Sequence, residues 1–122
     1  MSKYLHENLT RKIIRCFYNV HDELGYGFLE GVYENALMIE LEKSNLKAEN
    51  QKAIKVFYDN KVVGEYRVDI IVEDKVMIEL KAVSRLNKMH EVQLINYLKA
   101  TGIKLGLLVN FGKKLEFKRK IF

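Results

Sequence analysis

Apolar residues are spaced along the chain in ways that predict distinct types of secondary structure. Apolar side chains three or four residues apart form one face of a helix, whereas alternating apolar residues form one face of a strand. Helical spacing is found over residues 7 to 24, 29 to 44 and 88 to 101. Strand patterns are found over residues 53 to 58, 62 to 72, 76 to 83, 105 to 111 and 115 to 121.

Glycines and short polar segments separate these elements. Gly25 ends the first helix, Gly102 ends the last one, and polar turns lie at residues 59 to 61 and 73 to 75. The run from 105 to 111 is almost entirely apolar, which is typical of a strand covered on both faces. The pattern therefore predicts the order α-α-β-β-β-α-β-β, a mixed α/β sheet.

The composition is that of a globular protein with one domain, spanning residues 1 to 122. Apolar residues make up 48% of the chain, enough to build a core without disulfides. The one cysteine, Cys16, has apolar neighbours, and we expect it to be a buried helix residue. Residues 1 to 19 lack the apolar stretch of a signal peptide, and no apolar run is long enough for a membrane span. We therefore expect a cytoplasmic protein.

The net charge of +5 is unevenly distributed. Acidic residues are frequent in the first third of the chain, whereas the C-terminal end is basic. The cations of this end are Lys113, Lys114, Lys118, Arg119 and Lys120. A basic end is compatible with phosphate contacts. A solvated basic strand that aids solubility explains each of these cations equally well.

The polar residues of the predicted hairpin fall on one face. If residues 73 to 75 form its turn, Asp69 lies directly opposite Glu79, and Arg67 lies opposite Lys81. Side chains alternate between the two sides of a strand, so Asp69, Glu79 and Lys81 share one face. The apolar residues of the other face are Ile70, Val72, Ile78 and Leu80.

Two carboxylates opposite each other in a sheet require an explanation. Like charges in this position are destabilising, so such a pair either raises a pKa or binds a cation. Hard cations such as Mg²⁺ bind carboxylate oxygens together with water and phosphate. Lys81 would then orient or activate a water, or stabilise negative charge on a phosphate. A solvent-exposed hairpin has the same spacing, but both carboxylates lie within apolar stretches, where charges seldom lack a partner.

With these residues the chain resembles the PD-(D/E)xK nuclease superfamily, through Asp69 and the Glu79-Leu80-Lys81 segment followed by a helix. More closely, it resembles the GxxExxY family within that superfamily. The naming motif reads Gly27-Phe28-Leu29-Glu30-Gly31-Val32-Tyr33, and the other matching segments are residues 93 to 98 and 106 to 112. Val68 stands where the superfamily's name has proline, at a position that supplies no ligand.

The resemblance implies a restriction-endonuclease-like fold and a metal-dependent nuclease acting on nucleic acid, with DNA favoured. It implies Mg²⁺ or Mn²⁺ held by Asp69, Glu79 and the backbone carbonyl of Leu80, with Glu30 completing or orienting the site. It also implies a catalytic role for Gln93, because a glutamine on the helix after this strand lines the cleft in related nucleases.

Further side chains are predicted to contact the substrate, namely Arg67, Tyr33 and Tyr97. For Tyr33, packing with a hydrogen bond from its hydroxyl is the favoured alternative. Glu34 lies one helical turn from Glu30 on the same side of the helix, so either carboxylate could reach the metal. Glu30 is favoured because it fits the motif, and we expect Glu34 to be an exposed helix carboxylate.

The residues leave several functions open. The chain either hydrolyses phosphodiester bonds or is a binding or accessory module that keeps the fold without turnover. A metal-dependent phosphatase is a third reading, since a fold does not dictate one chemistry. A homodimer is compatible with the resemblance, because small nucleases of this architecture often dimerise to cut two strands.

Overall fold

A computed structural model of the protein describes residues 5–122. The first helices are α1 (Glu7–Leu24) and α2 (Glu30–Lys43), and they precede the strands β1 (Ala48–Tyr58), β2 (Lys61–Val72) and β3 (Val76–Lys81). Helix α3 (Lys88–Thr101) then leads to the strands β4 (Leu105–Phe111) and β5 (Leu115–Ile121). The predicted order α-α-β-β-β-α-β-β is confirmed.

Two strand boundaries differ from their predictions by more than one residue. Strand β1 begins at Ala48 instead of residue 53, because its polar first half pairs with the second half of β2 without forming an apolar face. Strand β3 ends at Lys81 instead of residue 83. The side chain of Asn110 forms hydrogen bonds with both backbone groups of Val83 in place of strand pairing. Oδ1 accepts from the N–H of Val83 at 2.9 Å, and Nδ2 donates to its C=O at 2.8 Å.

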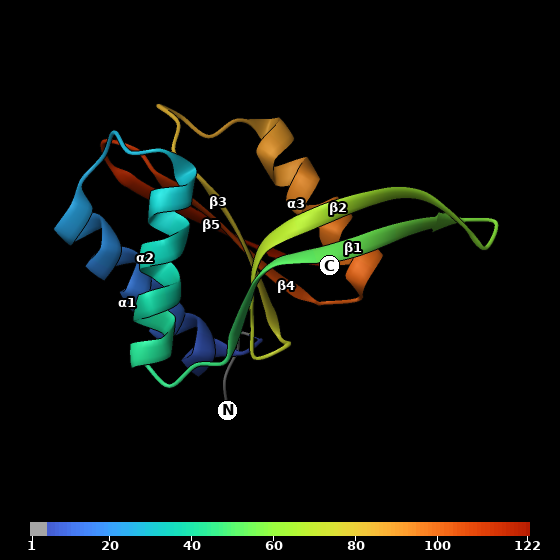
Figure 1. Cartoon of the computed structure of the whole chain (residues 1–122), viewed down its shortest axis with the longest axis horizontal. Coiled ribbons are helices and arrows are strands. Elements are labelled where there is room, and N and C mark those ends of the chain that lie inside the picture. The colour runs from blue at the N-terminus through green and yellow to red at the C-terminus, as the bar shows by residue number, and fades with distance from the viewer. Residues whose placement is uncertain (1–4) are drawn as a thin grey trace.

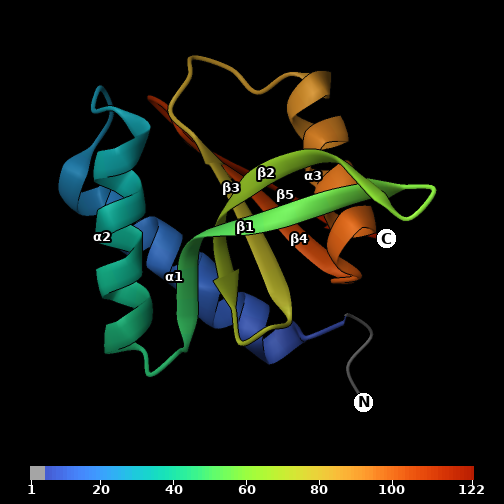
Figure 2. The same cartoon turned by 45° about the vertical axis from the view of Figure 1, so that its right-hand side comes forward.

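The strands form one sheet in the order β1-β2-β3-β4-β5. Strands β3 and β4 are parallel and the other neighbours are antiparallel. Helix α3 provides the crossover that a parallel pair requires. Figures 1 and 2 show α1 and α2 together against one face of the sheet and α3 against the other face.

Each face of the sheet carries its own hydrophobic core. On the side of α1 and α2, the buried core includes Ile70, Val72, Ile78 and Leu80, the four residues predicted to share a face. On the side of α3, Leu94 and Leu98 belong to the same core as Met77 and Leu108. Every residue of β4 is buried, which confirms that this strand is covered on both faces. Full burial of one such aliphatic side chain contributes about 1.5–3 kcal/mol.

Strands β1 and β2 continue past the rest of the sheet as a long twisted hairpin (Figures 1 and 2). We call residues 53–67 the arm. Its pairing with β3 has already ended, since the pairs between β2 and β3 run only from Val72↔Val76 to Ile70↔Ile78. Apolar side chains near its tip are exposed, namely Phe57, Tyr58, Val62 and Val63. None of the helices among residues 5–122 has the length and apolarity to cross a membrane.

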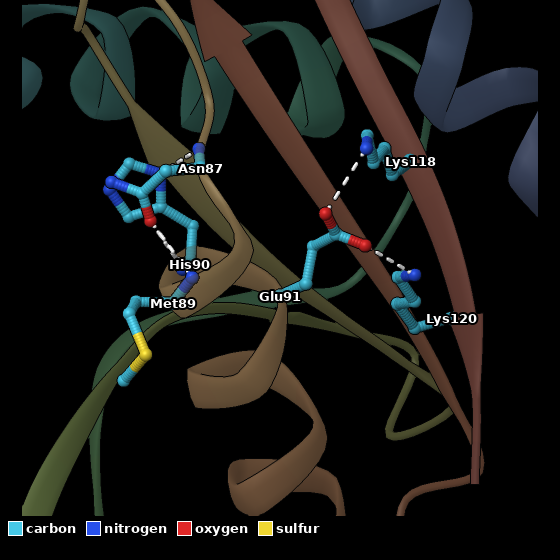
Figure 3. Close-up of polar contacts among 6 residues, drawn as sticks. All are labelled: Asn87, Met89, His90, Glu91, Lys118 and Lys120. Atoms are coloured by element: carbon cyan, nitrogen blue, oxygen red, sulfur yellow. Dashed lines mark hydrogen bonds and ion pairs between the residues drawn. The ribbon is translucent and has the colours of Figure 1, made fainter.

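A capping box sets the start of α3 (Figure 3). The Asn87 side-chain oxygen accepts from the backbone N–H groups of Met89 at 2.9 Å and His90 at 3.2 Å. In return, Nδ1 of His90 accepts from the backbone N–H of Asn87 at 3.2 Å. This reciprocal cap satisfies N–H groups that the first turn of a helix leaves unpaired.

Ion pairs attach α3 to the last strand (Figure 3). The Glu91 carboxylate lies 3.1 Å from Nζ of Lys118 and 2.6 Å from Nζ of Lys120. Lys120 and Lys118 lower the pKa of Glu91 to about 2. Two cations of the predicted basic end are thus already paired with a carboxylate, which weakens the interpretation that they contact phosphate.

Candidate functional site

The candidate site lies where β2 and β3 part. Beyond Ile70↔Ile78, side chains take over the hydrogen bonds that a regular ladder would form. The backbone N–H of Asp69 donates to Oε1 of Glu79 at 3.1 Å, and the N–H of Leu80 donates to Oδ2 of Asp69 at 2.9 Å. Each of the two carboxylates therefore accepts a hydrogen bond from the strand opposite to its own.

The predicted register is confirmed where β2 and β3 pair, since Val72 lies opposite Val76 and Ile70 opposite Ile78, but the pairing ends sooner than predicted. Backbone pairing was expected to continue past Asp69 and Glu79 and to place Arg67 opposite Lys81. The pairs between β2 and β3 end at Ile70↔Ile78, so Arg67 and Lys81 keep only the partners on their other sides, Ala53 of β1 and Asn110 of β4. Strand β2 leaves β3 to form the arm, and β3 stays with β4. Asp69 and Glu79 are linked, but through their carboxylates rather than through a continuous ladder.

Burial perturbs both carboxyl groups. Glu79 is only 4% exposed. Burial, followed by the charge of Asp69, raises the pKa of Glu79 to about 8. Burial also raises the pKa of Asp69, against the hydrogen bond from Leu80, with further increases from the charges of Glu34 and Glu30. Without a cation, the protein thus holds two carboxyl groups whose simultaneous ionisation is unfavourable.

Lys81 is the last residue of β3 and is partly buried. Its charge lowers the pKa of both Asp69 and Glu79, which means that its ammonium group lies within electrostatic reach of both carboxylates. The structure therefore brings together the three residues that the sequence pattern singled out.

Two further residues join the site that the sequence analysis did not assign to it. Glu34 accepts from Nε2 of Gln51 at 2.8 Å through Oε1 and from Nδ2 of Asn50 at 3.1 Å through Oε2. The same Nε2 of Gln51 lies 3.5 Å from Oδ1 of Asp69. Gln51 thus bridges a carboxylate of α2 and a carboxylate of β2. The prediction that Glu34 is exposed is wrong, since it is 9% exposed.

An unusual backbone conformation accompanies this bridge. Gln51 has a φ of 54°, in the left-handed region that residues other than glycine rarely adopt. Its neighbours Asn50 and Lys52 pair regularly with Ile70 and Val68. Strain of this kind tends to occur at functional sites, where the surrounding structure maintains it. The polar stretch around Gln51 has no periodicity, so only the tertiary structure reveals this residue.

Glu30 is the first residue of α2, and its side chain is exposed. Its charge raises the pKa of Asp69, but less than that of Glu34 does. Among residues 5–122, no three histidine, cysteine, aspartate or glutamate side chains gather closely enough to hold a metal ion. A metal-ligand role for Glu30 accordingly stays a prediction, as does the role of the Leu80 carbonyl.

Residues of α3 and the arm border the carboxylates. Nε2 of Gln93 donates to the Tyr97 hydroxyl at 2.9 Å. Burial raises the pKa of Tyr97, and the charges of Glu79 and Asp69 raise it further, so this ring lies near the pair. Arg67 donates from Nη1 to the backbone C=O of Gln51 at 2.8 Å.

Tyr33 lies apart from this group. It is fully buried, and its ring stacks on Phe111 with centroids 4.8 Å apart. Its hydroxyl donates to the C=O of Gly25 at 2.9 Å and accepts from the N–H of Phe28 at 3.3 Å. Because the ring is enclosed, the predicted substrate contact is wrong for Tyr33, and the alternative packing role describes it.

The donor set suits a hard divalent cation. Glu79 supplies buried carboxylate oxygens and Asp69 partly buried ones, and their repulsion is the condition that a bound cation would relieve. Oxygen donors are the ligands that Mg²⁺ and Mn²⁺ prefer. Soft ligands are not involved, since the one cysteine of the chain, Cys16, lies in the core on the side of α1 and α2. The residues present therefore fit the metal that the resemblance implied.

Comparisons with known proteins agree with this fold. The crystal structure of SSO0001 is similar to this chain, with a TM-score of 0.60 and 20% sequence identity over 75% of the chain. At this identity the likeness concerns the fold alone. The chain spans about half of that protein, corresponding to 48% of its length. No curated protein matches the chain.

The match to a protein family covers nearly all the described residues. Residues 7–120 match the PD-(D/E)XK nuclease superfamily. That span includes the strands that carry Asp69, Glu79 and Lys81 and the helix that carries Gln93. The chain belongs to the PD-(D/E)XK nuclease superfamily.

Proposed function

We propose that this protein is a metal-dependent nuclease that hydrolyses phosphodiester bonds of nucleic acid, with DNA as the favoured substrate. One observation carries the proposal. A buried carboxylate, Glu79, and a partly buried one, Asp69, are held together at the point where β2 and β3 part, with the charge of Lys81 within reach of both.

Asp69, Glu79 and the carbonyl of Leu80 would hold Mg²⁺ or Mn²⁺, and Glu30 at the start of α2 is the proposed further ligand. When bound, the cation supplies positive charge that lowers the pKa of water and neutralises the phosphate. The Lys81 ammonium donates hydrogen bonds to the attacking water or to a phosphate oxygen, where negative charge develops.

The other residues position this group. Gln51 holds the Asp69 carboxylate from one side and is itself held by Glu34. Gln93 directs its amide towards the Tyr97 hydroxyl, which leaves its carbonyl oxygen as an acceptor for water or substrate. Arg67, through its guanidinium, offers a phosphate contact at the edge of the site.

A cleavage assay tests the proposal. Single-stranded and double-stranded DNA and RNA are incubated with the protein in Mg²⁺, Mn²⁺ or EDTA. We expect cleavage only with a divalent cation, and a loss of at least about 100-fold for Glu79→Gln and Lys81→Met. Matched controls are Glu65→Gln and Lys61→Met, exposed residues of β2 away from the site, which should cleave like the wild type. Absence of cleavage of every substrate with both metals would refute it.

A second candidate is a binding or accessory module without turnover. It is favoured by one observation, that no three acidic, histidine or cysteine ligands are gathered among residues 5–122. Metal-binding calorimetry on the wild type and on Asp69→Asn separates the two. Metal binding that Asp69→Asn abolishes, without any cleavage by the wild type, would favour the module.

Within the superfamily, we assign the chain to the GxxExxY group on the motif at residues 27 to 33. A homodimer and a cytoplasmic location stay predictions.

A further inference from the structure

A groove lies between α3 and the arm. Its volume is about 820 Å³, and the residues that matter here are Lys55, Phe57, Tyr66, Gln93, Tyr97 and Lys99. The volume is within the range of about 300–1,000 Å³ that holds small organic ligands. It can therefore take a nucleobase or two, but not the full width of a duplex.

The groove carries charge of one sign. Its charged lining residues are Lys55 from β1 and Lys99 from α3, and no carboxylate of the described chain lines it. The Lys99 ammonium also lies 5.7 Å from the centroid of the Phe122 ring, which helps to keep it at the end of α3. An anionic ligand is favoured by such a lining, and cationic or neutral apolar partners gain nothing from these lysines.

Aromatic rings form part of the same lining. Tyr66 is 48% exposed and Phe57 is 61% exposed. The Tyr66 ring is supported by Tyr97, at a centroid distance of 5.5 Å and an interplanar angle of 41°. Tyr97 is itself 7% exposed and is hydrogen-bonded to Gln93. An exposed ring on a buried ring is a firm platform for stacking.

The groove borders the candidate site at Tyr97. Gln93 and Tyr97 line the groove. The charges of Glu79 and Asp69 raise the pKa of Tyr97, so this ring also lies near the carboxylates. A strand that lies in the groove would therefore bring its backbone to the carboxylates.

We propose that the groove binds an unpaired segment of nucleic acid, with a base stacked on Tyr66 and its phosphates near Lys55 and Lys99. The inference rests on the proposed function, and it names the substrate class as single-stranded. Cationic grooves with exposed rings bind single strands because every base has a face that can stack. In a duplex those faces are already stacked on neighbouring bases, and only edges and phosphates are presented.

Binding is tested without metal, so that the result does not depend on turnover. Fluorescence anisotropy in EDTA measures the affinity of the full chain for a labelled single-stranded DNA, the same sequence as RNA, and the matched duplex. We expect tighter binding of either single strand than of the duplex. Tyr66→Leu should weaken single-strand binding roughly tenfold, while Tyr66→Phe should retain it. Tyr58→Leu is the matched control, since Tyr58 is an exposed tyrosine of β1 outside the groove lining.

Two further readouts separate stacking from a general loss of structure. A 2-aminopurine base in the single strand should lose fluorescence on binding to the wild type and to Tyr58→Leu, but not to Tyr66→Leu. The slope of the logarithm of affinity against the logarithm of salt concentration should become shallower in Lys55→Met, by the amount that corresponds to about one phosphate contact. Lys61→Met, at the tip of the arm, should leave this slope unchanged. The two lysine variants test the groove even if Tyr66→Leu fails to fold.

Several outcomes would overturn the inference. One is a duplex that binds as tightly as the single strands, and another is equal binding by Tyr66→Leu and Tyr58→Leu. A third is a dimer, detected by sedimentation, that Tyr66→Leu dissociates and that binds no nucleic acid. That result would mean that a second copy of the chain covers the groove. A nuclease that cleaves but fails these binding tests keeps its proposed function and loses only this inference.

Discussion

At the scale of single residues, the candidate site consists of polar side chains held where backbone pairing stops. Asp69 and Glu79 accept N–H groups that a longer ladder would have used, and Gln51 holds Asp69 from α2's side through Glu34. Keeping these groups in place has an electrostatic cost, which raises the pKa of both carboxyl groups.

The raised pKa of Glu79 predicts a pH dependence of stability. Its value in the folded protein is about 8, above the 4.5 of an unperturbed glutamate. The folded protein therefore binds a proton at Glu79 more tightly than the unfolded chain does. The stability that this proton contributes is fully present below about pH 4.5 and is lost as the pH rises through about 8. In EDTA, the free energy of unfolding should fall over this range, as measured by urea denaturation at a series of pH values.

Glu79→Gln should remove much of this decline, because the amide does not ionise. Glu65→Gln, an exposed carboxylate on β2, should keep it. An unchanged slope in Glu79→Gln would contradict the prediction. Added Mg²⁺ should raise the stability of the wild type at pH 8, because a ligand of the folded state shifts the equilibrium towards it.

The left-handed backbone of Gln51 predicts an unusual order of substitutions. Residues with a Cβ lose about 1–2 kcal/mol in this conformation, and glycine does not. Gln51→Gly should therefore be about 1 kcal/mol more stable than Gln51→Ala in urea denaturation. At Lys52, where φ is not positive, the order should reverse. If glycine and alanine are equivalent at position 51, the strain is not present in solution.

At the scale of elements, α3 is placed by its cap, its ion pairs and its packing on β4. Asn87 begins the helix, and Glu91 ties it to β5. Gly106 of β4 allows the close approach of Leu94, since a Cβ at this glycine would lie 2.7 Å from Leu94 Cδ1. The packing distance between α3 and the sheet determines the positions of Gln93 and Tyr97 relative to the carboxylates.

Gly106→Ala should accordingly push α3 away from the sheet. We expect a loss of about 1–3 kcal/mol in urea denaturation, as for other overpacked cores. The double variant Gly106→Ala with Leu94→Ala should lose less than the sum of the single variants, because the two side chains compete for one space. Gly31→Ala is the control, since a Cβ there meets nothing within 4 Å. Additive losses would show that the clash is relieved in another way.

At the scale of the whole molecule, the protein combines a body of packed helices and strands with a projecting arm (Figures 1 and 2). The body contains two cores on the faces of β3 and β4, and the residues of β4 are all buried. Only β1 and β2 pair within the arm, and its tip exposes apolar side chains. The groove and the candidate site lie where the arm meets the body.

This division predicts unequal hydrogen exchange. Local opening requires least free energy where few buried contacts are broken. Amides of residues 57–64 should therefore exchange at least about 100-fold faster than those of residues 105–111, as measured by mass spectrometry in EDTA. A single-stranded oligonucleotide should slow exchange around Tyr66, and the amides of β4 should be unaffected. Uniform protection of the arm and the body would contradict this picture.

Much of the fold could be predicted from the sequence because its signals are local. The apolar period of α1 and α3, the glycines and polar turns, and the continuous apolar run of β4 each depend on neighbouring residues, and their positions were predicted correctly. The four apolar residues of the hairpin's inner face were also identified, since side-chain alternation in a strand needs no tertiary information. The Asp69, Glu79 and Lys81 group follows from the same alternation.

The tertiary structure alone decided the rest, because those features depend on contacts between distant segments. The departure of β2 from β3 replaced a continuous ladder with carboxylate-to-backbone bonds, and no local signal marks where pairing stops. Glu34 is buried because Gln51, from another element, reaches it. The sequence by itself thus determined the elements and the residues of the carboxylate pair. Packing between elements decided how that pair is held and which groove leads to it.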